Sequence, residues 1–188
     1  GSPGIGLTRI AFKQEHDPYK EIHVADFDGH NATRLTHDNS NAAGPGWTPN
    51  NNMLYYCTYH RDNPDIWSHN VKTGARQEVV RLPGTNSSPA VSPDGRRLAM
   101  VLSKAGSPDI WVGSATNRSG LRRLTTTKED ESSPCWSPDG RWICFTSRTD
   151  GRTALYKIPS NGGAMSRIHT IGAFNATEPD WSPDGKAI

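Results

Sequence analysis

Short runs of apolar residues recur along the chain and are separated by turn dipeptides. Four of these runs are almost continuously apolar, at residues 10–12, 54–56, 98–100 and 143–145. A strand that is apolar on both faces is typical of a sheet packed between two other sheets. No segment keeps an apolar period of 3.6 residues, so the pattern predicts an all-β protein with essentially no helix.

One five-residue word occurs four times, at intervals of 44, 45 and 45 residues. It reads Trp-Ser-Pro-Asp-Gly at residues 136–140 and 181–185, Val-Ser-Pro-Asp-Gly at 91–95 and Trp-Thr-Pro-Asn-Asn at 47–51. Proline, aspartate and glycine in this order favour a hairpin turn. A long repeat built from short strands is the signature of propeller blades. The sequence therefore predicts a β-propeller of four repeats of about 45 residues, each a four-stranded antiparallel blade.

The ends of the chain allow two arrangements. The first repeat begins at a second strand and the last stops after a first strand, so we expect the terminal strands to complete one shared blade. The same ends also fit four repeats of a larger propeller, and both readings stay open. We expect fourth strands at 34–36, 78–80, 123–125 and 167–169, and one propeller domain over residues 1–188, with residues 1–8 as a tag remnant or linker.

Composition removes several classes of function. The net charge of +2 and the lack of a Lys/Arg run argue against nucleic-acid binding. No apolar stretch is long enough to span a membrane. The three cysteines are expected to be buried free thiols. If Trp136 pairs with Trp142, Cys135 faces Ile143 and Cys144 lies on the opposite face.

Catalytic chemistry is not predicted from any motif. The Gly-x-Ser-x-Gly elbow of hydrolases does not occur, and the carboxylates of the repeated word belong to its turns. His16, His37 and His60 could share one rim of the ring, but their spacing does not match a metal-binding motif. We therefore predict no enzyme activity, metal or cofactor.

The repeat resembles a known family. Pro-x-Trp-Ser-Pro-Asp-Gly-Lys/Arg at 134–141 and 179–186, Ile-Ala-Phe at 10–12 and Asp-Ile-Trp at 65–67 and 109–111 are similar to the TolB-type, WD40-like propeller repeat. The resemblance covers nearly the whole chain. Propellers of this family have six blades and an N-terminal α/β domain, whereas this sequence carries four repeats and lacks that domain.

The resemblance implies a periplasmic, non-catalytic propeller that binds a peptidoglycan-associated lipoprotein-like partner or an extended peptide. In the family, the partner docks on the loops that enter each first strand, together with the loops between second and third strands. The oligomeric state is left open. By position, the partner-binding residues are His37, His60, Arg61, Thr85, Asn86, Ser88, Lys104, Ser132, Ser133, Arg148, Thr177 and Glu178.

Two alternative functions remain. The first is a metal-dependent lyase or sugar-binding propeller similar to the oligogalacturonate lyases, which use histidines around a metal. The second is a regulatory propeller excised from a larger hydrolase. Both rest on analogy of fold.

Overall fold

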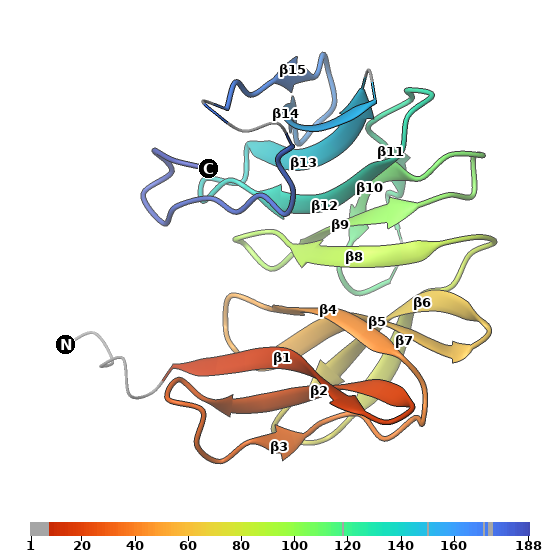
Figure 1. Ribbon diagram of the computed structural model, residues 1–188, viewed down its shortest axis with the longest axis vertical. Coiled ribbons are helices and arrows are strands. Elements are labelled where there is room, and N and C mark those ends of the chain that lie inside the picture. Colours follow the sequence, from red (N-terminus) through yellow and green to blue (C-terminus); the bar gives the residue numbers. More distant parts are fainter. Residues whose placement is uncertain (1–7, 118, 150, 171, 173–174) are drawn as a thin grey trace.

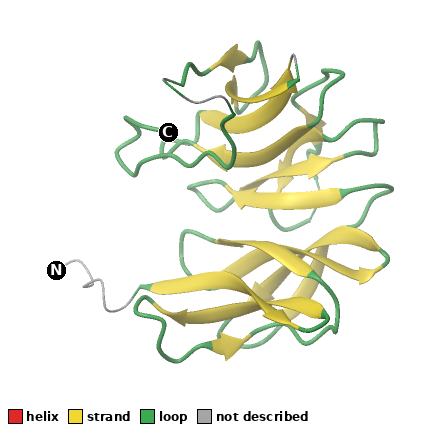
Figure 2. Cartoon of the chain, in the orientation of Figure 1, coloured by secondary structure: helices red, strands yellow, loops and turns green. Residues whose placement is uncertain are grey.

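The computed structural model describes residues 8–117, 119–149, 151–170, 172 and 175–188, except for the side chains of His16 and Thr149. The described residues form fifteen strands in four antiparallel sheets and no helix, as the sequence predicts (Figures 1 and 2). No helix among them could therefore cross a membrane. The expected tag or linker lies outside the described residues, apart from Thr8.

We call the four sheets blades 1 to 4, in chain order. Blade 1 has three strands: β1 (Arg9–His16), β2 (Tyr19–Asp26) and β3 (Thr33–Arg34). Blade 2 contains β4 (Ala42–Trp47), β5 (Met53–Arg61), β6 (Asn63–Asn70) and β7 (Arg76–Val80). Blade 3 contains β8 (Asn86–Val91), β9 (Arg97–Leu102), β10 (Asp109–Ser114) and β11 (Arg122–Arg123). Blade 4 contains β12 (Glu131–Trp136), β13 (Trp142–Thr149), β14 (Arg152–Pro159) and β15 (Ser166–Arg167).

The blades stack face to face, with blade 1 and the C-terminal segment at opposite ends of the stack (Figure 1). Residues 175–188 form the fourth copy of the hairpin, closed by Ser182 and Ala187, but contain no strand. Blade 1 consists of β1, β2 and β3 alone. In the described part of the chain, the expected completion of one blade by both termini is therefore not present.

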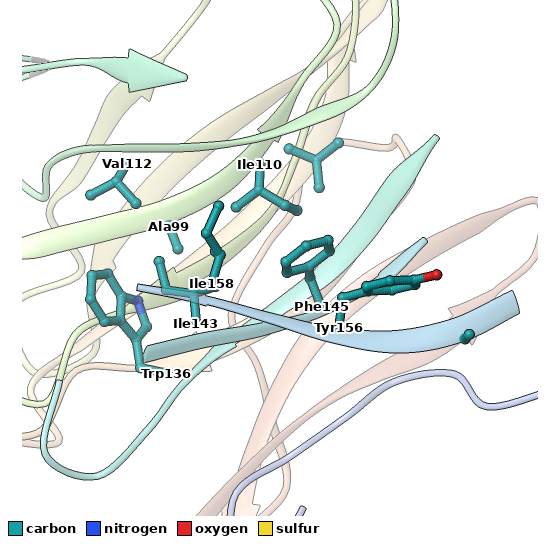
Figure 3. Close-up of a cluster of buried hydrophobic side chains, with 10 residues drawn as sticks. Ala99, Ile110, Val112, Trp136, Ile143, Phe145, Tyr156 and Ile158 are labelled. Atoms are coloured by element: carbon teal, nitrogen blue, oxygen red, sulfur yellow. The ribbon is translucent and has the colours of Figure 1, made fainter. Parts of the chain in front are cut away.

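The hydrophobic core lies between the blades. Alternate residues of one strand face opposite neighbours: Leu54 and Tyr56 pack toward blade 1, whereas Tyr55 packs toward blade 3. The largest cluster joins blade 3 to blade 4, where Ile143 and Phe145 are fully buried (Figure 3). This two-sided packing explains why the second strands are apolar on both faces.

The repeated word forms a hairpin turn in each copy, and in blades 2, 3 and 4 this turn joins the first strand to the second. The fifth residue of the word has a left-handed backbone, with φ of 55° at Asn51, 73° at Gly95, 69° at Gly140 and 71° at Gly185. The aspartate carboxylate of the repeated word stabilises the turn, as expected. The Asp139 carboxylate accepts hydrogen bonds from the Ser137 hydroxyl and the Arg141 amide. The Ser137 bond first, and then those from Arg141, lower the pKa of Asp139 to about 2.

The predicted register of the β12–β13 hairpin is wrong by one residue. Cys135 pairs with Cys144, and Trp136 pairs with Ile143. The Ser137 amide donates to the Trp142 carbonyl at 2.9 Å, and the Ser137 hydroxyl accepts from the Trp142 amide, also at 2.9 Å. Trp142 therefore bonds to Ser137 and not to Trp136. The two cysteines therefore share one face. Both are free thiols as predicted, but Cys135 is half-buried and not buried as expected.

The strands predicted as fourth in the repeat are shorter than expected in blades 1, 3 and 4. These strands, β3, β11 and β15, end at Arg34, Arg123 and Arg167. After each arginine the next amide still bonds to the third strand, and the chain then leaves the sheet. In blade 1 a side chain replaces the next backbone acceptor, because the Thr36 hydroxyl accepts a hydrogen bond from the Ile22 amide at 2.9 Å. Thr125 does the same for Ile110 in blade 3.

Candidate partner-binding rim

The loops that precede first strands and those that join second to third strands meet at one end of each blade. We call this end the loop rim and the opposite end, which carries the repeated word, the hairpin rim. Backbone bonds connect the two kinds of loop: Ser103 donates to the Thr85 carbonyl at 3.1 Å, and Ala176 donates to the Thr153 carbonyl at 3.0 Å. The repeated word therefore lies away from the predicted binding surface.

Asparagine side chains make two of these connections. Asn41 Oδ1 accepts from the Lys20 amide, and Asn175 Oδ1 accepts from the Thr153 amide, each at 3.1 Å. Both asparagines stand six residues before a tryptophan of the repeated word. A short side-chain amide can replace a backbone acceptor, so each asparagine holds its loop against the neighbouring hairpin.

Each first strand contains a bulge close to the loop rim. The third residue before the repeated word is left-handed in all four copies, with φ of 60° at Gly44, 50° at Ser88, 51° at Ser133 and 53° at Glu178. The strand registers of blades 2, 3 and 4 shift at this point. A bulge re-aims the side chains around it, and non-glycine residues at positive φ are uncommon. Ser88, Ser133 and Glu178 are therefore held in repeated, constrained positions.

A partly buried ion pair anchors the loop between blades 1 and 2. Arg76 of β7 donates two hydrogen bonds to the Asp38 carboxylate, at 2.6 and 2.7 Å, and one to the Tyr56 hydroxyl at 2.9 Å. Its guanidinium also lies 5.1 Å from the Trp67 ring centroid. Burial alone would raise the pKa of Asp38, but the hydrogen bonds and charge of Arg76 outweigh burial and lower it.

Buried carboxylates recur at the start of the third strand. Glu21, Asp65 and Asp109 are spaced by 44 residues and are almost fully buried. Arginine pairs with each, at 2.7 Å for Arg34–Glu21, 3.8 Å for Arg81–Asp65 and 2.6 Å for Arg123–Asp109. Their spacing is visible in the sequence. The Asp38–Arg76 pair has no such signal, because it joins the loop before β4 to β7 of blade 2.

A hollow of about 300 Å³ opens on the loop rim of blade 2. Arg61 and Arg81 line it beside Asp65. Burial is the main cause that raises the pKa of Asp65, and the charge of Glu78 adds to it. Arg61 donates to the Glu78 carboxylate at 3.1 Å and lies 5.7 Å from the Trp67 ring centroid.

Most of the predicted partner-binding residues are accessible on the loop rim. Thr85, Ser88 and Ser133 are half-buried. The exposed ones are His37, His60, Arg61, Lys104, Ser132, Arg148, Thr177 and Glu178.

Asn86 is a correction to the predicted set, because it is fully buried and cannot contact a partner. Its side-chain amide donates to the carbonyls of Leu82 and Pro64, at 2.8 and 3.1 Å. Asn86 therefore holds the loop between blades 2 and 3 in place.

The histidines do not form a metal site within the described chain, where no group of three potential ligands comes together. His37 and His60 lie close enough to Asp38 for their charge to lower its pKa, after the larger contributions from burial and Arg76. Both carboxylate oxygens of Asp38 already accept hydrogen bonds from Arg76. The position of the His16 side chain lies outside the described residues.

Comparison with known proteins identifies the repeat. The family described as the TolB beta propeller domain matches residues 1–188, the whole chain. The chain belongs to the TolB β-propeller family. A relative of this propeller, the Tol-Pal system protein TolB of Desulfosudis oleivorans, is 36% identical over 127 residues, which are 66% of this chain and 28% of that protein. The chain spans about a third or less of this and other curated relatives.

Solved structures agree with this TolB propeller fold. The crystal structure of TolB from Acinetobacter baumannii matches with a TM-score of 0.88 at 26% identity, covering 98% of this chain and 47% of that one. An oligogalacturonate lyase in complex with manganese matches with a TM-score of 0.52 at 13% identity, covering 94% of this chain and 65% of that one. The second likeness shows a shared fold only.

Proposed function

We propose that this TolB propeller is a non-catalytic binding module of a Tol-Pal system, and that its loop rim binds a protein partner. The membership of the chain in the TolB family supports the assignment. The partner we propose is the periplasmic domain of a peptidoglycan-associated lipoprotein, so the protein would work in the periplasm. Loops on a rigid scaffold are where binding residues concentrate in such folds.

The repeated bulge is the observation that carries this proposal. It places one residue before each copy of the repeated word in the same backbone conformation next to the loop rim, while hydrogen bonds hold the surrounding loops. A preformed surface binds without the cost of ordering its loops. Glu178 is exposed in the last bulge and offers a carboxylate to the partner.

Charge reversal tests the proposed surface. We expect Glu178→Lys to weaken binding of the lipoprotein domain at least tenfold in calorimetric titration, because a bound carboxylate would be replaced by a like or unpaired charge. Asp28→Lys is the matched control, since it makes the same change of charge in the turn after β2, at the hairpin rim. Equal affinity of the two variants would place the binding surface elsewhere. No binding of the unmodified protein at high micromolar concentration would reject the lipoprotein as partner.

The lyase reading makes a different prediction. If the histidines near Asp38 formed a catalytic metal site, protein purified without chelator would carry a stoichiometric divalent ion. Replacement of His37 or His60 would then remove that ion. Metal analysis separates the two functions independently of any partner.

A further inference from the structure

Two cysteines of blade 4 face each other across neighbouring strands. Cys135 of β12 and Cys144 of β13 are direct partners in the antiparallel register. Directly opposed residues of such a pair have Cα atoms about 4.5–5.5 Å apart and side chains on the same face. This spacing lies inside the range of about 4.4–6.8 Å that a disulfide requires. Cys57 faces Ala43 instead and has no thiol opposite it.

The two thiols differ in access and reactivity. Cys135 is half-buried, whereas Cys144 is fully buried. A hydrogen bond from the Cys135 thiol, with help from the Phe145 amide and the charge of Lys157, lowers the pKa of Cys144. The same thiol contact, together with burial, raises the pKa of Cys135. The negative charge of Asp180 also acts on Cys135, which places the pair beside the C-terminal segment.

We propose that Cys135 and Cys144 are a modification site, at which a low-molecular-weight disulfide such as oxidised glutathione drives formation of a reversible cross-strand disulfide. The accessible Cys135 thiolate attacks one glutathione sulfur and releases the first glutathione. The Cys144 thiolate then attacks the Cys135 sulfur, forms the protein disulfide and releases the second glutathione. Two protein thiols are oxidised, one glutathione disulfide is reduced, and the two thiol protons leave on the released glutathiones.

The order of attack follows from access, because Cys135 is half-buried whereas Cys144 is fully buried. The first step is slow, because few Cys135 thiols are ionised and only the thiolate is a nucleophile. The second step is fast, because the Cys144 thiol is already in contact with the sulfur that it attacks. The mixed disulfide therefore does not accumulate in the unmodified protein. It does accumulate when Cys144 is replaced.

Mass spectrometry of the folded protein with oxidised glutathione tests this site. The expected product has lost two hydrogen atoms, and its peptide map contains a link between Cys135 and Cys144. Cys144→Ser should instead stop at a glutathione adduct on Cys135, and Cys135→Ser should form neither product. Cys57→Ser is the matched control and should behave as the unmodified protein. A stable adduct, a link between two chains, or an unreacted dithiol in the unmodified protein would each overturn the proposal.

Discussion

Removal of the Asp38 carboxylate should destabilise the propeller more than a surface substitution does. Arg76 would lose two charge-assisted hydrogen bonds in a site where Asp38 is only 9% exposed. Breaking a fully buried ion pair from one side costs about 3–5 kcal/mol. Because Arg76 remains 26% exposed and keeps its contact with Tyr56, we expect Asp38→Ala to cost about 2–3 kcal/mol.

Urea denaturation of four proteins separates the pair from its surroundings. The single variants Asp38→Ala and Arg76→Met and their double variant form a cycle, in which methionine keeps part of the apolar stem over Trp67. We expect a coupling free energy of about 2 kcal/mol. Asp28→Ala, an exposed carboxylate of the hairpin rim, should change stability by less than about 0.5 kcal/mol.

The pH dependence gives the same prediction a second test. The pKa of Asp38 is lowered in the folded state, so its contribution is fully present above the unfolded pKa of about 4. It is lost as the pH falls through the lower folded value. The difference between the unmodified protein and Asp38→Ala should therefore be constant near neutral pH and shrink below about pH 4. A coupling near zero, or a difference that ignores pH, would refute the role given to this pair.

Two further predictions concern blade 2 and the repeated word. Burial first, and then the charge of Arg76, lower the pKa of His69 to about 4. The free energy of unfolding should therefore fall as the pH drops from about 6.5 toward 4, by about 3 kcal/mol at most. His69→Phe should flatten this part of the pH profile, and an unchanged profile would show that another group titrates. Gly95→Ala places a side chain at φ 73° and should cost about 1–2 kcal/mol in urea denaturation. Asn51→Gly, at the equivalent position, should cause no loss, and equal stability of Gly95→Ala and the unmodified protein would contradict this account of the turn.

The repeat architecture could be predicted because it depends on local chemistry that recurs. The second strands are apolar on both faces, those of blades 2 and 3 lie between two blades, and a left-handed residue closes each hairpin. The apolar runs and the left-handed turn position can both be predicted from short sequence windows. The spacing of Glu21, Asp65 and Asp109 was equally visible, but its meaning depends on the arginines that the fold brings to each carboxylate.

The incorrect predictions concern positions where single side chains form contacts that the sequence pattern does not show. The register of the β12–β13 hairpin differs from the predicted one by one residue, since the Ser137 hydroxyl accepts from the Trp142 amide. Cys144 therefore lies opposite Cys135. Asn86 was predicted as an accessible loop residue, yet its amide nitrogen bonds to oxygens of β6 and of the loop between β7 and β8. Neither outcome follows from periodicity, because each depends on the position of a neighbouring element.

The hydrophobic cores and the loop rim are formed by different residues. Each blade buries its apolar side chains against the adjacent blades, so the residues of the loop rim are not required for the cores. Their backbones are nevertheless fixed, by Asn41 and Asn175 and by the Asp38–Arg76 pair. A rim with a fixed backbone can change its side chains, and therefore its partner, without loss of stability. Glu178→Lys should thus alter affinity with little change in stability, whereas substitutions at Asp38 should alter stability first.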